Sequence, residues 1–206
     1  MDQAKLKQTL AGLKLEQRDS QLEMFSACTK AIAHNTLLCV EAPTGIGKTL
    51  AYCLAALSSK TKDETVIIST ATVALQDQLL HSDVPLLEKI LNRKIKAAIA
   101  KGRRRYVCHA RVFQQNLFQL EENHSDIDDK LQNLLNKNQW AGDRDSLDLS
   151  VSPKDWQRFS TDRNGCTGGR CAYFEECAFF KARRAMETAE LVITNHNLLL
   201  SDLELG

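Results

Sequence analysis

The chain has 206 residues, of which 43% are hydrophobic and 26% are charged, and its formal net charge is +1. A chain of this size and apolar content can bury one large core or two small ones, which excludes a wholly disordered protein, and no apolar run approaches the ~20 residues of a membrane span. Because the first residues are polar and lack the apolar centre of a signal peptide, we expect a soluble, cytoplasmic protein without a membrane partner, whose seven cysteines are ligands or core residues rather than disulfides.

Helical and strand-like patterns alternate between residues 21 and 100. The run 37–40 is apolar throughout and has the length of a buried strand. Either Thr70 or Thr72 can serve as an N-cap for the helix that follows. Alternation of this kind predicts a parallel sheet with crossover helices. The predicted helices cover 21–34, 48–59, 72–80 and 85–91, and the predicted strands cover 37–40, 64–69 and 95–99.

The pattern changes after residue 100. Residues 101–180 are polar, contain cysteines and aromatic residues, and show few strand-like runs, whereas 191–194 again has the composition of a strand. We therefore predict an α/β domain that is interrupted by an inserted domain. Its first part covers 1–100, the insertion covers 101–180, and the α/β domain resumes over 181–206.

A glycine turn between the first predicted strand and its helix matches a variant of the phosphate-loop pattern, with Ala42 at the usual first glycine. Backbone amides around Gly45 and Gly47 can wrap phosphates, and the helix N-terminus favours anions. Lys48 would reach the β and γ phosphates, and the Thr49 hydroxyl would hold Mg²⁺. The alternative is a turn that only joins the strand to the helix. The predicted nucleotide-binding residues of the loop are Ala42, Pro43, Thr44, Gly45, Ile46, Gly47, Lys48 and Thr49, with Lys48 and Thr49 as the catalytic pair.

Four of the seven cysteines lie in the predicted insertion: Cys108, Cys166, Cys171 and Cys177. The other three fall in the predicted α/β core, where a free cysteine behaves as a small apolar residue. Structural zinc sites usually have two-residue gaps within a cysteine pair, but the last three cysteines of the insertion are separated by four and five residues. Wider gaps favour an iron–sulfur cluster; a zinc site and unligated thiols are the alternatives.

The run 101–111 contains five basic residues and no acidic one. A local basic patch in an otherwise neutral chain suggests a restricted anion-binding surface. Lysine and arginine can supply phosphate contacts, and an exposed aromatic ring can stack on a base. A solvated face of the domain is the alternative. The predicted nucleic-acid contacts in this run are Arg103, Arg104, Arg105 and Tyr106.

Several segments together resemble the superfamily 2 iron–sulfur DNA helicases of the XPD-like family, in particular the DinG/YoaA branch. Residues 41–49 resemble the first helicase motif, and 69–78 resemble motif Ia. Residues 18–21 resemble an upstream element whose glutamine reads adenine, 101–108 resemble the start of the iron–sulfur domain, and 195–199 resemble the return to the motor domain. Cys166, Cys171 and Cys177 match the remaining cluster ligands in order and gap.

This resemblance implies a RecA-like first motor domain with a partial parallel sheet and an inserted, mainly helical 4Fe–4S domain. It implies ATP hydrolysis with Mg²⁺, 5′-to-3′ unwinding of DNA, a role in DNA repair, and single-stranded or forked DNA as the partner. By the same resemblance, Cys108, Cys166, Cys171 and Cys177 would hold the cluster and Arg18 and Gln21 would contact the nucleotide. Motif Ia, through Thr70 and Gln76, and the cluster domain would touch single-stranded DNA.

One departure from the family pattern affects the expected activity. The 206 residues contain no Asp-Glu pair in an apolar strand, so they lack the carboxylates that should hold Mg²⁺ and activate water, and they lack a second motor domain. We therefore expect this chain alone to be nearly inactive, with the rest of the helicase as a continuation or a split partner. The alternatives are a non-motor module that binds single-stranded DNA or senses redox state, and an unrelated phosphate-loop ATPase or kinase with a zinc knob.

Overall fold

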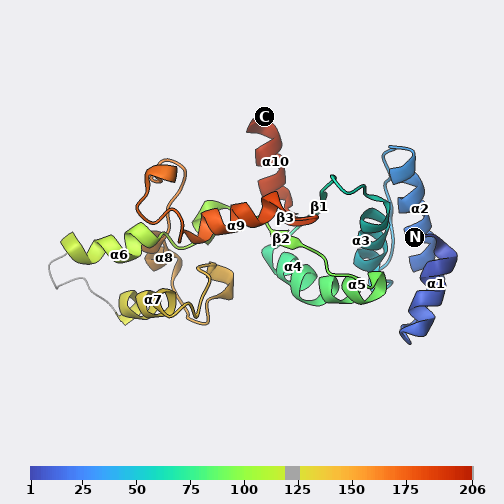
Figure 1. Ribbon diagram of the computed structural model, residues 1–206, viewed down its shortest axis with the longest axis horizontal. Helices are drawn as coiled ribbons and strands as arrows, with labels where there is room; N and C mark the ends of the chain where they lie inside the picture. The colour runs from blue at the N-terminus through green and yellow to red at the C-terminus, as the bar shows by residue number, and fades with distance from the viewer. Residues whose placement is uncertain (119–125, 206) are drawn as a thin grey trace. The chain divides into compact units, whose positions relative to one another are not determined.

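The computed structural model describes residues 1–118 and 126–205 and divides into two compact units (Figure 1). The first unit combines Met1–Ile99 with Thr188–Gly206, and the second is Ala100–Glu187. Within the described ranges, no helix is both long and apolar enough to cross a membrane.

A three-stranded parallel sheet organises the first unit. Its strands β1 (Val66–Thr70), β2 (Ala97–Ile99) and β3 (Leu191–Asn195) lie in the order β1-β3-β2. Leu191 of the central strand is in register with Val66 on one side and with Ala97 on the other. The parallel α/β sheet expected from the sequence is thus confirmed, including the return of the chain to the sheet near residue 190.

Four helical segments of the first unit form where the apolar spacing predicts them, whereas α1 and α10 were not predicted. Leu22 and Phe25 of α2 and Leu54 of α3 are each only 1% exposed, and they belong to one core with Ile193 of the central strand. Thr72 caps α4 by accepting a hydrogen bond from Leu75 N over 3.3 Å. The helices are α1 (Gln3–Gly12), α2 (Asp19–Ala33), α3 (Lys48–Ser59), α4 (Val73–Gln78), a π-helical turn (Leu79–Asp83), α5 (Val84–Leu91) and α10 (His196–Leu205).

The predicted strand at 37–40 is wrong for this structure. The segment has no regular secondary structure, Leu37 is 100% exposed, and Leu38 and Val40 are about 40% exposed. Cys39, which we expected in the core, is exposed as well. A strand persists only when its N–H and C=O groups pair in a ladder, and none of the three described strands pairs with this run. Apolar composition alone therefore does not place the segment in the sheet.

The second unit is mainly helical and has its own core. Val107, Leu131, Trp156 and Phe159 are at most 2% exposed and cluster with Phe179. Buried indole N–H groups need acceptors, and Trp156 Nε1 donates to Arg104 O over 2.7 Å. The helices are α6 (His109–Phe118), α7 (Asp126–Asn136), α8 (Pro153–Phe159) and α9 (Ala178–Glu187), with 3-10 turns at Arg103–Arg105, Arg144–Ser146 and Gly168–Arg170.

Two leucines of the first unit provide a matched test of this arrangement. Leu54 is buried and Leu37 is fully exposed, so Leu54→Ala should lower the free energy of unfolding by about 2–5 kcal/mol. Leu37→Ala should change it by less than about 0.5 kcal/mol. Urea unfolding followed by far-UV circular dichroism measures both. A loss for Leu37→Ala as large as that for Leu54→Ala would mean that the 37–40 run is buried after all.

Candidate functional site

The predicted phosphate loop connects α2 to α3 through two glycines in the left-handed backbone region. Gly45 has a φ of 85° and Gly47 a φ of 81°, and Gly47 immediately precedes the first residue of α3. Other residues would be strained at these angles. The loop therefore ends with the N-terminal N–H groups of α3, which favour an anion.

Lys48 is folded back over this loop. Its Nζ donates to Ala42 O over 3.0 Å and to Pro43 O over 2.9 Å. Both acceptors are neutral carbonyls, so the ammonium charge is solvated by the loop but not cancelled by a carboxylate. A phosphate placed at the loop could replace these carbonyls as the partner of Lys48.

The two predicted adenine-site residues contact the phosphate loop in this structure. Arg18 Nη1 donates to Gly45 O and Arg18 pairs with Glu16 over 2.5 Å, and the hydrogen bond from Arg18 holds the pKa of Glu16 below its ordinary value. Gln21 Nε2 donates to Gly47 O over 3.1 Å. The side chain approaches so closely that a Cβ on Gly47 would lie 2.0 Å from Nε2. Arg18 and Gln21 thus support the loop backbone, and their contact with adenine stays a prediction.

Tyr52 and Asp83 were not identified from the sequence. Tyr52 lies one helical turn after Thr49 on α3. Burial raises the pKa of the Tyr52 phenol, while the Thr49 hydroxyl acts in the opposite direction and the charge of Asp83 adds to the rise. Burial also raises the pKa of Asp83, in the π-helical turn. The spacing of Thr49 and Tyr52 in a predicted helix was the available signal, whereas the approach of Asp83 depends on tertiary packing.

The predicted DNA contacts of motif Ia are buried. Thr70 Oγ1 donates to Thr72 O over 2.9 Å, and the Gln76 side chain is 0% exposed. A DNA contact through Gln76 would require the surrounding residues to move. Ser69 precedes Thr70 on β1. Its hydroxyl is hydrogen-bonded to Nδ1 of His196, the first residue of α10, over 2.7 Å.

All four cysteines of the second unit line one pocket: Cys108, Cys166, Cys171 and Cys177. Its walls are largely aromatic, with Tyr106, Phe179 and Phe180 among them. Two N–H groups point at one sulfur, because Arg103 Nη1 donates to Cys166 Sγ over 2.9 Å and Gly168 N over 3.4 Å. Within residues 1–118 and 126–205, no three His, Cys, Asp or Glu side chains are grouped closely enough to hold a single metal ion.

This donor set fits an iron–sulfur cluster. Four thiols around one shared pocket are the ligand number that a 4Fe–4S cluster uses, and N–H donors to the sulfurs are a usual feature of such sites. Burial raises the pKa of the Cys108 thiol, whereas the backbone N–H of Arg111 acts in the opposite direction. Burial therefore disfavours the Cys108 thiolate. Because the thiolate is the form that binds metal, a bound metal would have to lower the pKa of this thiol.

The predicted DNA-binding run divides between several environments. Arg103 lies 4.0 Å from the Phe179 ring centroid and reaches the cysteine pocket, and Tyr106 is buried there, with burial raising its pKa to about 12. Arg105 forms an ion pair with Asp145. Arg104 is the most exposed of the set, at 75%, and pairs with Asp162 over 2.8 Å. Of the four residues, Arg104 alone presents most of its side chain to solvent.

Comparisons with known proteins identify helicases as relatives of this chain. A model of the DEAD/DEAH box helicase family matches residues 18–127. The ATP-dependent DNA helicase DinG of Escherichia coli K12 is 36% identical, over 91% of this chain and 29% of that protein. DinG of Salmonella typhimurium is 35% identical over the same shares, and DinG of Photobacterium profundum is 35% identical over 82% of this chain and 26% of its own length. The chain thus spans about three-tenths of the length of these relatives.

Arg103 and Arg104 form a matched pair for testing the cysteine pocket. Arg103→Ala removes a hydrogen bond to sulfur and a cation–π contact, so it should destabilise the second unit by roughly 1–2 kcal/mol. Arg104→Ala removes only an exposed ion pair and should cost less than about 1 kcal/mol. Both tryptophans belong to the second unit, so their fluorescence during urea unfolding reports on that unit alone. Equal losses for the two variants would contradict the assigned role of Arg103.

Proposed function

The chain belongs to the DEAD/DEAH box helicase family, and on that premise we propose that it is the nucleotide-binding and DNA-binding amino-terminal part of an ATP-dependent DNA helicase with a 4Fe–4S cluster. The observation that carries this proposal is the pairing of a phosphate loop in the first unit with a four-cysteine pocket in the second. The DinG relatives are named ATP-dependent DNA helicases, which supports the helicase activity. The proposed 5′-to-3′ direction rests on the resemblance to the iron–sulfur helicases.

In the proposed nucleotide site, Lys48 exchanges the carbonyls of Ala42 and Pro43 for phosphate oxygens. Its charge then gains a charged partner without any carboxylate having to be displaced. Arg18 and Gln21 keep the loop carbonyls turned away from the phosphates, because each donates a hydrogen bond to a glycine carbonyl. The Thr49 hydroxyl would coordinate Mg²⁺.

In the proposed cluster site, Cys108, Cys166, Cys171 and Cys177 hold the cluster inside the aromatic pocket. A bound cluster would be bonded to all four cysteines. It would thereby link the start of α6, at Cys108, to the loop before α9. The side chain of Arg103 and the N–H of Gly168 stabilise the charge on the Cys166 sulfur. Phe179 and Phe180 line the same pocket and would limit the access of water to a bound cluster.

Hydrolysis requires groups that this chain does not contain. Positioning of metal, water and charge-stabilising residues together drives phosphoryl transfer, and the 206 residues include no strand ending in an Asp-Glu pair. We therefore propose that this chain binds ATP but hydrolyses it poorly until the remainder of the helicase is present. Its proposed partner is single-stranded or forked DNA.

Substitution of Lys48 tests the nucleotide site. Lys48→Ala should weaken binding of a fluorescent ATP analogue roughly tenfold to hundredfold, because one charge-assisted contact is lost, while the affinity for single-stranded DNA stays unchanged. Lys62→Ala, at an exposed lysine beyond the far end of α3, is the charge-matched control. Wild-type affinity for the analogue in Lys48→Ala would refute the assignment of the loop.

A further inference from the structure

Two buried polar atoms of the second unit have no hydrogen-bond partner among the described residues: Thr161 Oγ1 and His109 Nδ1. Each of these residues is 8% exposed, and both line the cysteine pocket. A buried polar group without a partner costs about 1–3 kcal/mol, so native proteins rarely leave one unpaired. The place of both groups in the same pocket indicates that their partner binds there.

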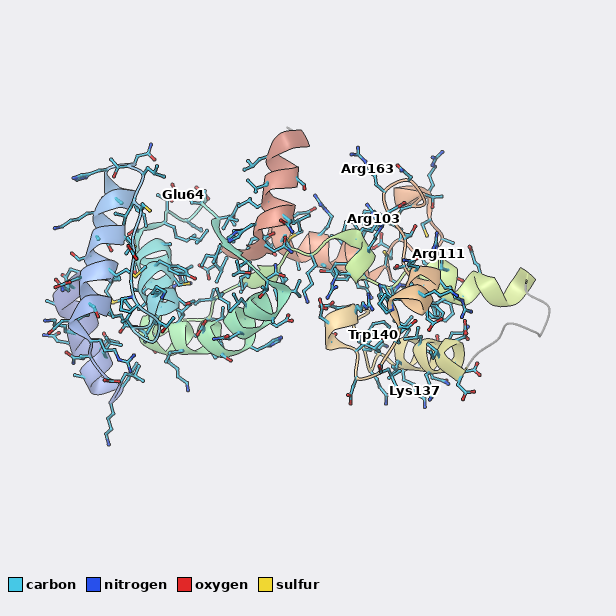
Figure 2. All side chains as sticks on the ribbon, turned by 180° about the vertical axis from the view of Figure 1, so that it is seen from behind. Glu64, Arg103, Arg111, Lys137, Trp140 and Arg163 are labelled. Carbon is cyan, nitrogen blue, oxygen red and sulfur yellow. The ribbon has the colours of Figure 1, made fainter. Side chains whose placement is uncertain are left out.

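The side-chain acceptors of the cysteine pocket are mainly sulfur atoms. Among its described lining residues, none has a carboxylate or amide side chain, and much of the remaining wall consists of aromatic rings such as Phe179 and Phe180. Arg103, labelled in Figure 2, and the N–H of Gly168 already donate to Cys166 Sγ, over 2.9 and 3.4 Å. Thr161 and His109 thus add two further donor groups to a pocket that already directs donors at sulfur.

Backbone pairing fixes Thr161 beside the segment of the first cysteine. Cys108 N donates to Phe159 O over 2.7 Å, and Val107 forms an antiparallel bridge with Ser160, the residue before Thr161. Because two backbone contacts hold the chain immediately before it, Thr161 cannot move away from Cys108 without breaking them. The hydroxyl is therefore a preorganised group of the pocket.

The second cysteine segment approaches Thr161 from another direction. Gly165, the residue before Cys166, lies so close that a Cβ on it would be 2.7 Å from Thr161 Oγ1. Asp162 Oδ1 holds this turn by accepting a hydrogen bond from Gly165 N over 3.0 Å. Glycine at position 165 thus allows the chain that carries Cys166 to pass directly beside the hydroxyl.

His109 occupies an equivalent place on the other side of the first cysteine in sequence. It follows Cys108 directly, as the first residue of α6, and its ring centroid lies 6.2 Å from that of Phe113. An imidazole can donate from Nδ1 both when it is protonated and in one of its neutral tautomers, and a nearby acceptor selects that tautomer. A sulfur acceptor in the pocket would therefore place the proton on Nδ1.

We infer that Thr161 Oγ1 and His109 Nδ1 donate hydrogen bonds to sulfur atoms of the bound cluster. This inference rests on the proposed function and assigns two residues that the cysteine spacing does not identify. A donor to a cluster sulfur stabilises the more negative, reduced form and so raises the reduction potential. Loss of either donor should therefore lower the potential, although all four cysteine ligands remain.

The test uses the full chain, purified anaerobically, and begins with the iron and acid-labile sulfide content of each variant. Titration with dithionite and redox mediators, followed by electron paramagnetic resonance, then gives the reduced fraction of the cluster at each potential. Thr161→Val replaces the hydroxyl by a methyl group of similar size, and Thr161→Ser keeps the hydroxyl. His109→Leu removes the N–H, whereas His109→Asn keeps an N–H donor near the position of Nδ1.

The matched control is Thr167→Val. It makes the same chemical change at an exposed threonine that follows Cys166 directly but does not line the cysteine pocket. A fall in potential that came only from removing a hydroxyl near a cluster ligand would appear in this variant as well. The control therefore separates a donor inside the pocket from a general effect of polarity.

Thr161→Val and His109→Leu should each lower the ratio of reduced to oxidised cluster at a fixed potential roughly tenfold, because one hydrogen bond to a charged acceptor is lost. Tenfold corresponds to a fall of about 59 mV for a one-electron couple. Thr161→Ser and His109→Asn should stay within about threefold of wild type, and Thr167→Val within about twofold. If Thr161→Val prevents loading of the cluster, full loading of Thr161→Ser supports the inference and failure of both overturns it.

An unchanged potential in Thr161→Val or in His109→Leu, at the iron content of wild type, would overturn the assignment of that donor. A fall of equal size in Thr167→Val would overturn both assignments. These results leave the cluster itself in place, so they are distinct from a failure of the proposed function. Absence of iron and sulfide from the wild-type protein would refute the proposed function, and the two donors with it.

Discussion

Strand β3 is the element on which the sheet of the first unit depends. It lies between β1 and β2, so the backbone groups on both of its edges pair with strands that precede it by many residues. Residues 100–190 separate β2 from β3 in the chain, yet Ala97 and Leu191 are in register. The sheet is complete only when the chain has passed through the second unit and β3 pairs with β1 and β2. Loop closure over such a length is entropically costly, and an independent core within the second unit lowers this cost by ordering the intervening chain.

The proposed phosphate site holds its cation without a carboxylate among the described residues. Lys48 donates to the main-chain carbonyls of Ala42 and Pro43. A carboxylate partner would have to be displaced by an incoming phosphate and would then repel it, whereas a carbonyl can be given up at little cost. By contrast, Lys101 and Arg105 pair with Asp143 and Asp145, and their charges serve the fold. The carbonyl partners of Lys48 therefore leave its charge available to a phosphate, whereas the carboxylate partners of Lys101 and Arg105 do not.

Features that depend on local sequence could be predicted, and those that depend on tertiary contacts could not. The bounds of α3, the cap at Thr72 and the parallel strands follow from spacing and turn chemistry. The run 37–40 has strand composition, but pairing partners decide whether it becomes a strand. Arg103 was expected on a DNA-binding surface because it lies in a basic run, yet aromatic contacts from Phe179 turn it towards the cysteines.

The central claim is that the four cysteines of the second unit hold a 4Fe–4S cluster. The most direct measurement is the iron and acid-labile sulfide content of anaerobically purified protein, together with its visible absorption spectrum. We predict about four irons and four sulfides per chain, a brown colour, and loss of all three in Cys171→Ser but not in Cys39→Ser, which alters an exposed cysteine outside the pocket. One zinc per chain without sulfide would contradict the claim and leave a nucleotide-binding α/β unit joined to a structural zinc domain.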